Sequence, residues 1–221
     1  MLTKLFQKYN WLPYVLPMAV FMILTQLEGN FKEAYPAIYI AKVIAVGFLV
    51  WAAKGPLSEI KADKKWLGWS VFWGLLLLGM WILIEERVSY GRVGERSSFN
   101  PFTEMANPAF AYVFITFRMI GLALVVPIME EIFWRSFALR YATDKDFSNI
   151  PVGVFSWGAF AIVNAVFGFS HPEWLPAVLY SAFCGLYLNW TKSLWACVVV
   201  HLVTNLGLGI FILANSAWKY W

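Results

Sequence analysis

The chain has 221 residues, of which 61% are hydrophobic, 19% aromatic and 14% charged. A typical soluble domain carries about 25% charged residues, and a soluble fold of this size could not hide so much apolar surface. The composition therefore excludes an ordinary soluble domain and indicates a protein that uses the lipid bilayer as solvent. The formal net charge of +4 fits cations that sit near anionic lipid headgroups. No basic patch interleaved with aromatics indicates a nucleic-acid partner.

Apolar segments that approach the ~20 residues needed to cross a bilayer recur seven times along the chain. In order they are 11–27, 35–53, 66–84, 108–129, 151–168, 174–190 and 194–213. The fourth segment can continue to residue 141. We therefore predict an all-α fold: a polytopic membrane helical bundle of about seven to eight transmembrane helices with an intramembrane polar cavity. No repeat or second domain is visible, so residues 1–221 form one integral-membrane domain.

Basic residues in the predicted loops orient this bundle. With a cytoplasmic N-terminus, nine Lys and Arg residues lie on the cytoplasmic side and five on the opposite side, which is a positive-inside bias. The nine are Lys4, Lys8, Lys54, Lys61, Lys64, Lys65, Arg140, Lys145 and Lys192, and the five are Lys32, Arg87, Arg92, Arg96 and Lys219. No small-residue cleavage site follows the first span, so we expect that span to be retained.

Three polar motifs interrupt the apolar second half of the chain, and they contain its only two histidines. Ionisable groups are costly inside a membrane, so such residues first indicate a functional site. Because the motifs fall on separate spans, we expect one convergent polar pocket. The motif residues are Glu130, Glu131 and Arg135 in the first, Phe167 and His171 in the second, and His201 and Asn205 in the third.

In the first motif, the two adjacent acids have different partners available. Glu131 and Arg135 are four residues apart and share a helix face, whereas Glu130 is rotated by about 100°. We therefore expect Glu131 to be ionised and paired, and Glu130 to point into the cavity, where a poorly solvated carboxylate can accept a proton. Pro127 can break or kink the helix just before the acids. A salt-bridged cluster at a helix end is the structural alternative.

The two histidines fall in different local settings. Pro172 disfavours a helical conformation at His171, so we expect His171 at a helix end or on an unwound turn. His201 and Asn205 lie one turn apart on the last span, where both can donate hydrogen bonds into a shared cavity. Structural interpretations stay open here: an interfacial hydrogen-bonded histidine for His171, and polar contacts between helices for the other two residues.

The charged segment 85–107 lies between the third and fourth spans. Its composition predicts mostly a solvated loop. A lid over the site or a helix in the membrane interface is the alternative.

At the three motifs the chain resembles the CAAX prenyl protease and bacteriocin-processing family, the glutamate-dependent intramembrane proteases. That family carries Glu-Glu-x-x-x-Arg, Phe-x-x-x-His and His-x-x-x-Asn or Asp on successive helices of a membrane bundle, and all three match here. The resemblance covers about residues 108–213, the motif-bearing catalytic part. The proline- and aromatic-rich first half is similar to a bacterial CAAX-protease-related subgroup associated with exosortase systems, which implies a bacterial cytoplasmic membrane. The seven expected spans are one fewer than the eight helices of eukaryotic and archaeal relatives.

The resemblance implies an intramembrane endopeptidase with four catalytic residues. Glu130 would act as the general base and polarise a water together with His171. That water would attack a peptide carbonyl directly, with no covalent intermediate. His201 and Asn205 would donate hydrogen bonds to the developing oxyanion, a form of stabilisation that contributes ~3–4 kcal/mol per donor elsewhere.

The resemblance also implies supporting residues and partners. Glu131 and Arg135 would pair and hold the helix geometry. No cofactor would be needed, and the substrate would be a membrane-associated peptide or protein, with or without a lipid group.

Two other functions are compatible with the residues. The first is a zinc metalloprotease with Glu130, His171 and His201 as ligands and water in the open position. The second is a non-catalytic membrane protein, an immunity factor or transporter that uses the cluster as structural contact or proton relay.

Overall fold

The computed structural model describes residues 2–94 and 98–221. The chain is 81% helical, and no β-strand occurs in the described ranges, which confirms the all-α prediction. The α-helices are α1 (Leu2–Lys8), α2 (Leu12–Asn30), α3 (Tyr35–Ala52), α4 (Lys54–Ser58), α5 (Leu67–Arg87), α6 (Pro101–Glu104), α7 (Pro108–Ile120), α8 (Val126–Glu130), α9 (Leu139–Thr143), α10 (Trp157–Phe169), α11 (Trp174–Thr191) and α12 (Leu194–Asn215).

The seven predicted spans correspond to α2, α3, α5, the continuous helix from α7 to α9, α10, α11 and α12. Five helical stretches are long and apolar enough to cross a membrane: Leu12–Asn30, Lys32–Ala52, Lys64–Arg87, Pro108–Thr143 and Leu194–Asn215. Helix α10 is shorter, with 13 residues, and begins at Trp157 rather than at the predicted residue 151. Pro151 and Gly153, which has φ +86°, form a turn there, and such a φ suits glycine best.

The fourth span is one helical stretch of 36 residues, Pro108–Thr143. Of the break or kink expected at Pro127, a break does not occur. Instead, two parts of the stretch are π-helical, Gly121–Val125 and Glu131–Ala138. Proline has no N–H to return to the residue four before it, and the wide turns on either side keep the helix continuous. Such π turns are frequent at functional sites.

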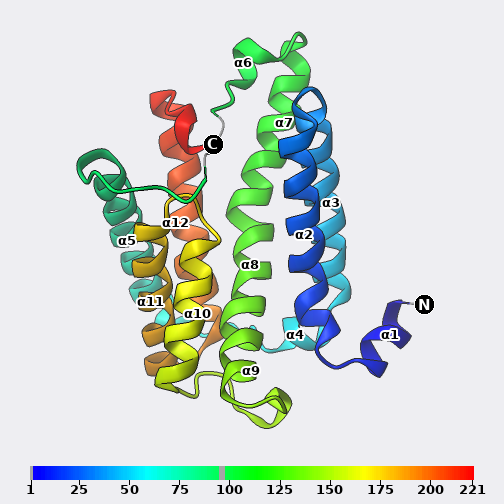
Figure 1. Cartoon of the computed structure of the whole chain (residues 1–221), viewed down its shortest axis with the longest axis vertical. Coiled ribbons are helices and arrows are strands. Elements are labelled where there is room, and N and C mark those ends of the chain that lie inside the picture. The colour runs from blue at the N-terminus through cyan, green and yellow to red at the C-terminus, as the bar shows by residue number, and fades with distance from the viewer. Residues whose placement is uncertain (1, 95–97) are drawn as a thin grey trace.

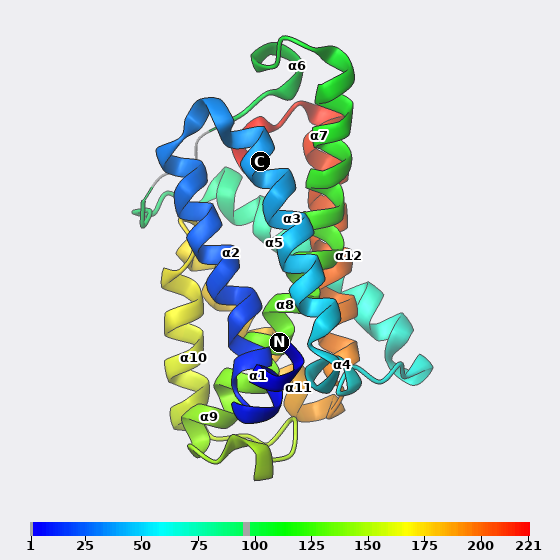
Figure 2. The same ribbon diagram turned by 90° about the vertical axis from the view of Figure 1, so that its right-hand side faces the viewer.

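The long helix α7–α9 runs through the middle of the bundle, with α2 and α3 on one side and α5, α10, α11 and α12 on the other (Figure 1). In the turned view α2 and α3 lie side by side, and they are in extensive contact (Figure 2). The N-terminus, α4 and α9 lie at one end, and α6 and the C-terminus lie toward the other (Figure 1). The predicted loops are thus grouped at the two ends. Arg96, part of the loop-charge prediction, lies outside the described residues.

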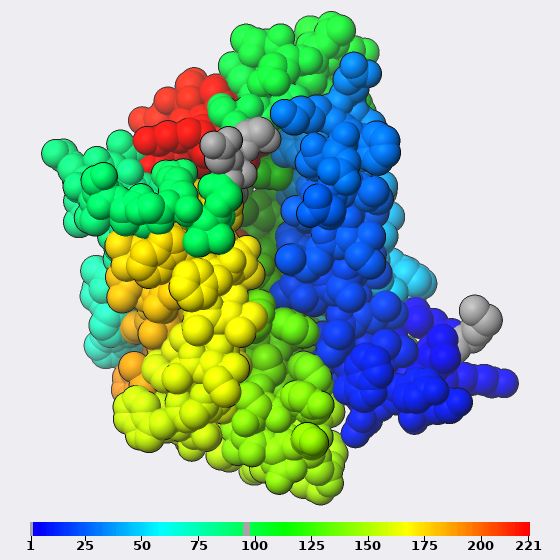
Figure 3. Space-filling model, in the orientation of Figure 1, coloured from blue at the N-terminus to red at the C-terminus, as the bar shows by residue number. Residues whose placement is uncertain are grey.

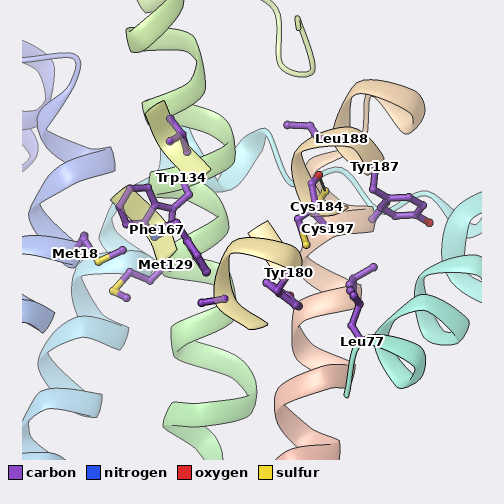
Figure 4. Close-up of a cluster of buried hydrophobic side chains, with 14 of the residues drawn as sticks. Met18, Leu77, Met129, Trp134, Phe167, Tyr180, Cys184, Tyr187, Leu188 and Cys197 are labelled. Atoms are coloured by element: carbon purple, nitrogen blue, oxygen red, sulfur yellow. Dashed lines mark hydrogen bonds between the residues drawn. The ribbon is translucent and has the colours of Figure 1, made fainter. Parts of the chain in front are cut away.

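The core lies where the two sides meet the long helix. Met18 of α2 lies next to Met129, Trp134 and Phe167 in one apolar cluster (Figure 4). The Trp134 and Phe167 rings meet edge to face, with centroids 5.5 Å apart. In the space-filling view the surface is hollowed between α2 and α10, and the green helix around α7 forms the floor (Figure 3).

One polar cluster ties the elements together at the end that holds α4 and α9. Arg140 donates to both carboxylate oxygens of Glu59 at 2.9 and 3.0 Å. Tyr14 and Ser136 also donate to that carboxylate. Since these residues come from α2, the segment after α4, the second π turn and α9, the contact fixes the long helix against the first span.

The segment predicted as a solvated loop is largely irregular, with the short helix α6 inside it. The first part of this segment is hydrogen-bonded to residues that closely follow His171 in the sequence. Val93 N–H donates to the carbonyl of Pro172 at 3.2 Å, and the indole N–H of Trp174 donates to the carbonyl of Gly91 at 2.6 Å. The predicted charges of Glu95 and Arg96 lie outside the described residues.

Candidate active site

Glu131 is the most enclosed residue of the candidate site, with 0% of its surface exposed. One oxygen lies 2.9 Å from Nδ1 of His201, and the other lies 3.3 Å from Nε of Arg135. The predicted pairing of Glu131 with Arg135 is therefore present, and the contact with His201 was not predicted. The guanidinium of Arg135 also packs over the Phe167 ring, 4.8 Å from its centroid. These contacts join the first motif to the other two.

Glu130 has a different environment from its neighbour. Its side chain is buried, but within the described part of the chain it has no hydrogen-bond or ion-pair partner. Its carboxylate oxygens keep some accessible surface, whereas Oε2 of Glu131 is fully enclosed. A carboxylate in this setting can bind water and accept a proton from it. The arrangement agrees with the predicted division between one paired and one free acid.

The contact with Glu131 fixes the way in which His201 can act. A carboxylate beside Arg135 is an acceptor, so Nδ1 of His201 carries the proton that it donates. In the neutral ring, Nε2 then holds a lone pair and cannot donate. The predicted role of His201 as an oxyanion donor therefore requires the protonated ring, with Glu131 as its counter-charge.

His171 follows the end of α10, as its neighbour Pro172 predicts. Its backbone N–H donates to the carbonyl of Gly168 at 3.0 Å. The ring stacks on Phe167, with centroids 4.6 Å apart, and Nδ1 lies 2.8 Å from the Phe167 carbonyl oxygen. Because a carbonyl only accepts, Nδ1 is the protonated nitrogen and Nε2 keeps its lone pair. That lone pair can accept a hydrogen bond from water.

Asn205 lies one turn beyond His201 on α12 and is half-buried. Its amide nitrogen donates to the carbonyl of Leu122 at 2.9 Å. Leu122 belongs to the first π turn, so Asn205 is held against the part of the long helix whose backbone geometry is unusual. The amide has a second N–H, which remains available to a ligand.

Tyr180 of α11 lies between the two histidine motifs, and sequence reasoning did not select it. Its ring meets His201 edge to face, with centroids 5.2 Å apart, and lies nearly parallel to Phe167 at 6.3 Å. Figure 4 shows Tyr180 among the buried core residues that link α11 to α12. A lone aromatic in an apolar span gives no signal that separates it from ordinary core. Tyr180 nevertheless brings His201 and the Phe167–His171 stack together.

Two surface hollows elsewhere do not touch the motif residues. One is lined by residues of α5 from Gly79 to Arg87, and the other by residues 29–34. The motif residues form a buried polar cluster. That this cluster lines a cavity open to water stays a prediction. Among the described residues, no three His, Cys, Asp or Glu side chains are grouped closely enough to hold a metal ion.

The comparisons with known proteins bear on the same half of the chain. Residues 111–207 match the family model described as "Type II CAAX prenyl endopeptidase Rce1-like". A search of curated proteins and a search of solved structures found no match. The matched range contains all three motifs, from Glu130 to Asn205. Over residues 111–207 the chain is thus similar to the CAAX protease-like family, and this match supports an intramembrane endopeptidase of that type.

Proposed function

We propose that the chain hydrolyses a peptide bond of a membrane-associated protein with a water activated by Glu130 and His171. The free, buried carboxylate of Glu130 is the observation that carries this proposal. Its neighbour Glu131 is paired with Arg135 and His201, so we assign the uptake of the proton to Glu130. The family supplies the reaction class, and the geometry supports this assignment of roles.

In the first step, the water oxygen forms a bond to the substrate carbonyl carbon. Glu130 takes the proton that the water loses, and Nε2 of His171 accepts the hydrogen bond of the second water proton. The carbonyl π electrons move to oxygen, which becomes an oxyanion. Asn205 donates its second N–H to that oxyanion, and protonated His201 donates from Nε2, with Glu131 as counter-charge.

In the second step, the oxyanion re-forms the carbonyl and the C–N bond breaks. Protonated Glu130 gives its proton to the leaving amine nitrogen, which restores the free carboxylate. The products are a new carboxylic acid on one fragment and an amine on the other, and the acid then gives its remaining proton to water or to the amine. No covalent enzyme intermediate forms, so no nucleophilic side chain is required.

The test compares membrane proteomes of cells that carry the wild-type chain, a Glu130→Gln chain or no chain. Glu130→Gln keeps the shape of the side chain and removes the base. We expect new protein termini only with the wild type, while the purified variant melts at the wild-type temperature. Lys32→Gln, which removes an exposed charge, is the matched control and should cleave normally. Cleavage retained by Glu130→Gln would contradict the proposed base.

A chelator arm separates this mechanism from zinc chemistry. The contact between Glu131 and His201 resembles the carboxylate–histidine pairs that orient metal ligands, which is the observation that favours zinc. We propose metal-independent hydrolysis, since the described residues provide no three-ligand group. Turnover by purified protein should persist in strong chelator. Loss of turnover that returns with added zinc would favour the metalloprotease.

The proposed substrate is a membrane-associated peptide or protein, and a lipid group on it is not required by the site. We also propose a bacterial cytoplasmic membrane with the N-terminus inside. Cysteine-accessibility labelling from either side of intact cells, at the α4 end and at the α6 end, tests this orientation.

A further inference from the structure

The segment after α5 makes contacts beside the candidate site that the proposed mechanism does not use. Residues 90–94, which we call the strap, run beside residues 172–174, which follow His171 in the sequence. Three contacts join the two segments: a hydrogen bond from an indole at 2.6 Å, an ion pair of 3.7 Å and a backbone hydrogen bond of 3.2 Å. In that order they join Gly91 to Trp174, Arg92 to Glu173 and Val93 to Pro172. Each step forward along the strap is one step back along the turn, so the two segments are antiparallel.

This antiparallel order extends the strap toward the histidine. Gly94 follows Val93, so the next position of the same order lies opposite His171. Gly94 has φ +82°, a conformation that suits glycine and changes the direction of the chain. In the space-filling view the green segment after α5 lies across the yellow region where α10 ends and α11 begins (Figure 3). The strap therefore covers the turn that carries His171.

Arg92 holds the strap through two carboxylates that belong to different elements. Its guanidinium donates to Glu85 of α5 and forms the ion pair with Glu173 of the turn. The side chains of Glu85 and Glu173 are only 1% and 3% exposed, whereas that of Arg92 is 43% exposed. A planar guanidinium has several N–H groups in a fixed fork and can serve two acceptors at once. Arg92 is thus a counter-charge that two buried carboxylates share.

The same face of α5 also borders the histidine ring. Trp81 precedes Glu85 by four residues, so the two side chains share a helix face. The Trp81 ring meets the His171 ring edge to face, with centroids 6.4 Å apart. Tyr90 of the strap donates to Glu85, and its ring meets that of Trp174 with centroids 5.9 Å apart. The helix, the strap and the turn therefore form one connected unit around the histidine.

The histidine needs such a unit because it lies beyond the last helical residue of α10. Helical hydrogen bonds do not fix the backbone that follows it, and its Nδ1 is held by the Phe167 carbonyl on one side. The hydrogen bond at one ring nitrogen decides which nitrogen carries the proton. A turn that moved would take the ring away from Phe167. Nε2 would then no longer be held as the acceptor toward water.

We propose that the strap, anchored by Arg92, positions His171 for the reaction by holding the turn in place. Arg92 is a positioning residue, since it acts through Glu173 and the turn. The inference rests on the proposed function, because it assumes that Nε2 of His171 accepts the hydrogen bond of the attacking water. Loss of Arg92 would leave two buried carboxylates without their shared cation, which favours release of the strap.

The first test observes the ring itself and needs no substrate. The full chain in phosphatidylcholine nanodiscs is labelled with ¹⁵N in its two histidines, and a His171→Gln variant assigns the ring resonances. Spectra are recorded at about pH 8.5, where an unperturbed imidazole is neutral. The wild type should show His171 with its proton on Nδ1 alone. Arg92→Gln should add a second set of resonances, from rings with the proton on Nε2. Arg87→Gln, which removes an exposed charge at the end of α5, is the matched control and should give the wild-type spectrum.

The second test measures turnover of a substrate that the proteome comparison identifies. Arg92→Gln should lower kcat by about tenfold to hundredfold, since a ~1 Å misplacement of a reacting group costs up to about a hundredfold. KM should change little, because Arg92 does not touch the substrate. Arg92→Lys should recover part of the loss, since it keeps the charge without the fork. Arg87→Gln should turn over normally.

Several results would overturn the role of the strap. They are a wild-type spectrum or wild-type kcat in Arg92→Gln, the second set of resonances in Arg87→Gln, and faster turnover in Arg92→Gln, which would make the strap a barrier to substrate. If Arg92→Gln does not fold, Trp174→Phe removes the indole hydrogen bond to Gly91 and should give the second set, and its absence would overturn the role equally. Resonances that respond to Arg92→Gln in a chain that cleaves nothing would remove the proposed function and leave the positioning of the ring.

Discussion

Two buried polar clusters of the bundle, one around Glu131 and one around Lys42, differ in how their charges are matched. Around Glu131, the carboxylate contacts both Arg135 and His201, and all three side chains lie in the family-matched range 111–207. Around Lys42, the ion pair with Glu28 is complete and Arg118 is left over. The first cluster joins motif residues to one another. The second joins the α2–α3 pair to the long helix.

The difference suggests how a membrane protein uses ionisable residues. A paired group such as Glu131 holds other side chains in place. Within the described residues, Glu130 in the first cluster and Arg118 in the second have no ion-pair partner. Each lies next to a matched group that fixes the local backbone. Predictions that separate matched from unmatched residues therefore test the comparison directly.

The largest effect is expected from removing the charge of Glu131. Glu131→Gln leaves Arg135 buried without a counter-charge, so the free energy of unfolding should fall by about 3–5 kcal/mol and turnover should also be lost. Thermal melting of detergent-solubilised protein, with a turnover assay, measures both. Glu130→Gln is the control, because it should lose turnover at an unchanged melting temperature. Equal destabilisation by the two variants would mean that both acids are structural.

In the second cluster, replacing one residue of the Glu28–Lys42 ion pair should destabilise the fold more than replacing both. Lys42→Met leaves Glu28 buried and unpaired, so we expect a loss of about 3 kcal/mol in unfolding free energy. Adding Glu28→Leu should recover most of that loss, because apolar side chains can replace a buried pair. Melting temperatures of the single and double variants give the answer. If the double variant were no more stable than Lys42→Met, the pair would contribute more to stability than the mutual neutralisation of its two charges.

Asn205 should affect rate more than stability. Asn205→Ala removes one proposed oxyanion donor, so turnover should fall by about a hundredfold or more with a small change in substrate affinity. His201→Ala should cost at least as much, and the two losses should be less than additive because they serve one site. Steady-state kinetics on the three variants would measure this. Normal turnover in Asn205→Ala would remove the residue from the oxyanion site.

The smallest effect is expected at an exposed ion pair outside both clusters. Lys219 and Glu86 lie 2.7 Å apart, but their side chains are 55% and 43% exposed. Water and salt screen such a pair, so Lys219→Ala should leave the melting temperature within the error of the measurement. If Lys219→Ala lowered the melting temperature as much as Glu131→Gln, burial would not explain why some ion pairs stabilise the fold more than others.

Much of the fold could be predicted from the sequence because a helix that crosses the bilayer needs ~20 mostly apolar residues. The seven apolar segments matched helices, and the start of α10 was displaced only where Gly153 needs a positive φ. Spacing of four residues predicted the contact between Glu131 and Arg135. The contact between Glu131 and His201 joins residues 70 positions apart, which no local pattern contains. The remainder of the fold depended on tertiary packing of this kind.

The second cluster was missed for a related reason. Glu28, Lys42 and Arg118 are single charged residues in three different spans, and none belongs to a recognisable motif. Glu28 comes just after the predicted span 11–27, where charges usually mark the membrane interface. Lys42 and Arg118 lie inside their predicted spans, but neither has a motif partner that would have selected it. Tyr180 was hidden in the same way among other aromatics of the core.

The π-helical turns have a consequence for comparing this chain with others. A π turn holds an extra residue, so the direction of Glu130 depends on how many residues lie between Gly121 and Glu130. Deleting one residue from that stretch would keep every motif letter and rotate the following helix by about 100°. Two chains with identical motifs can therefore point different acids at the substrate. An alignment that places its gaps freely before Glu130 would hide that difference.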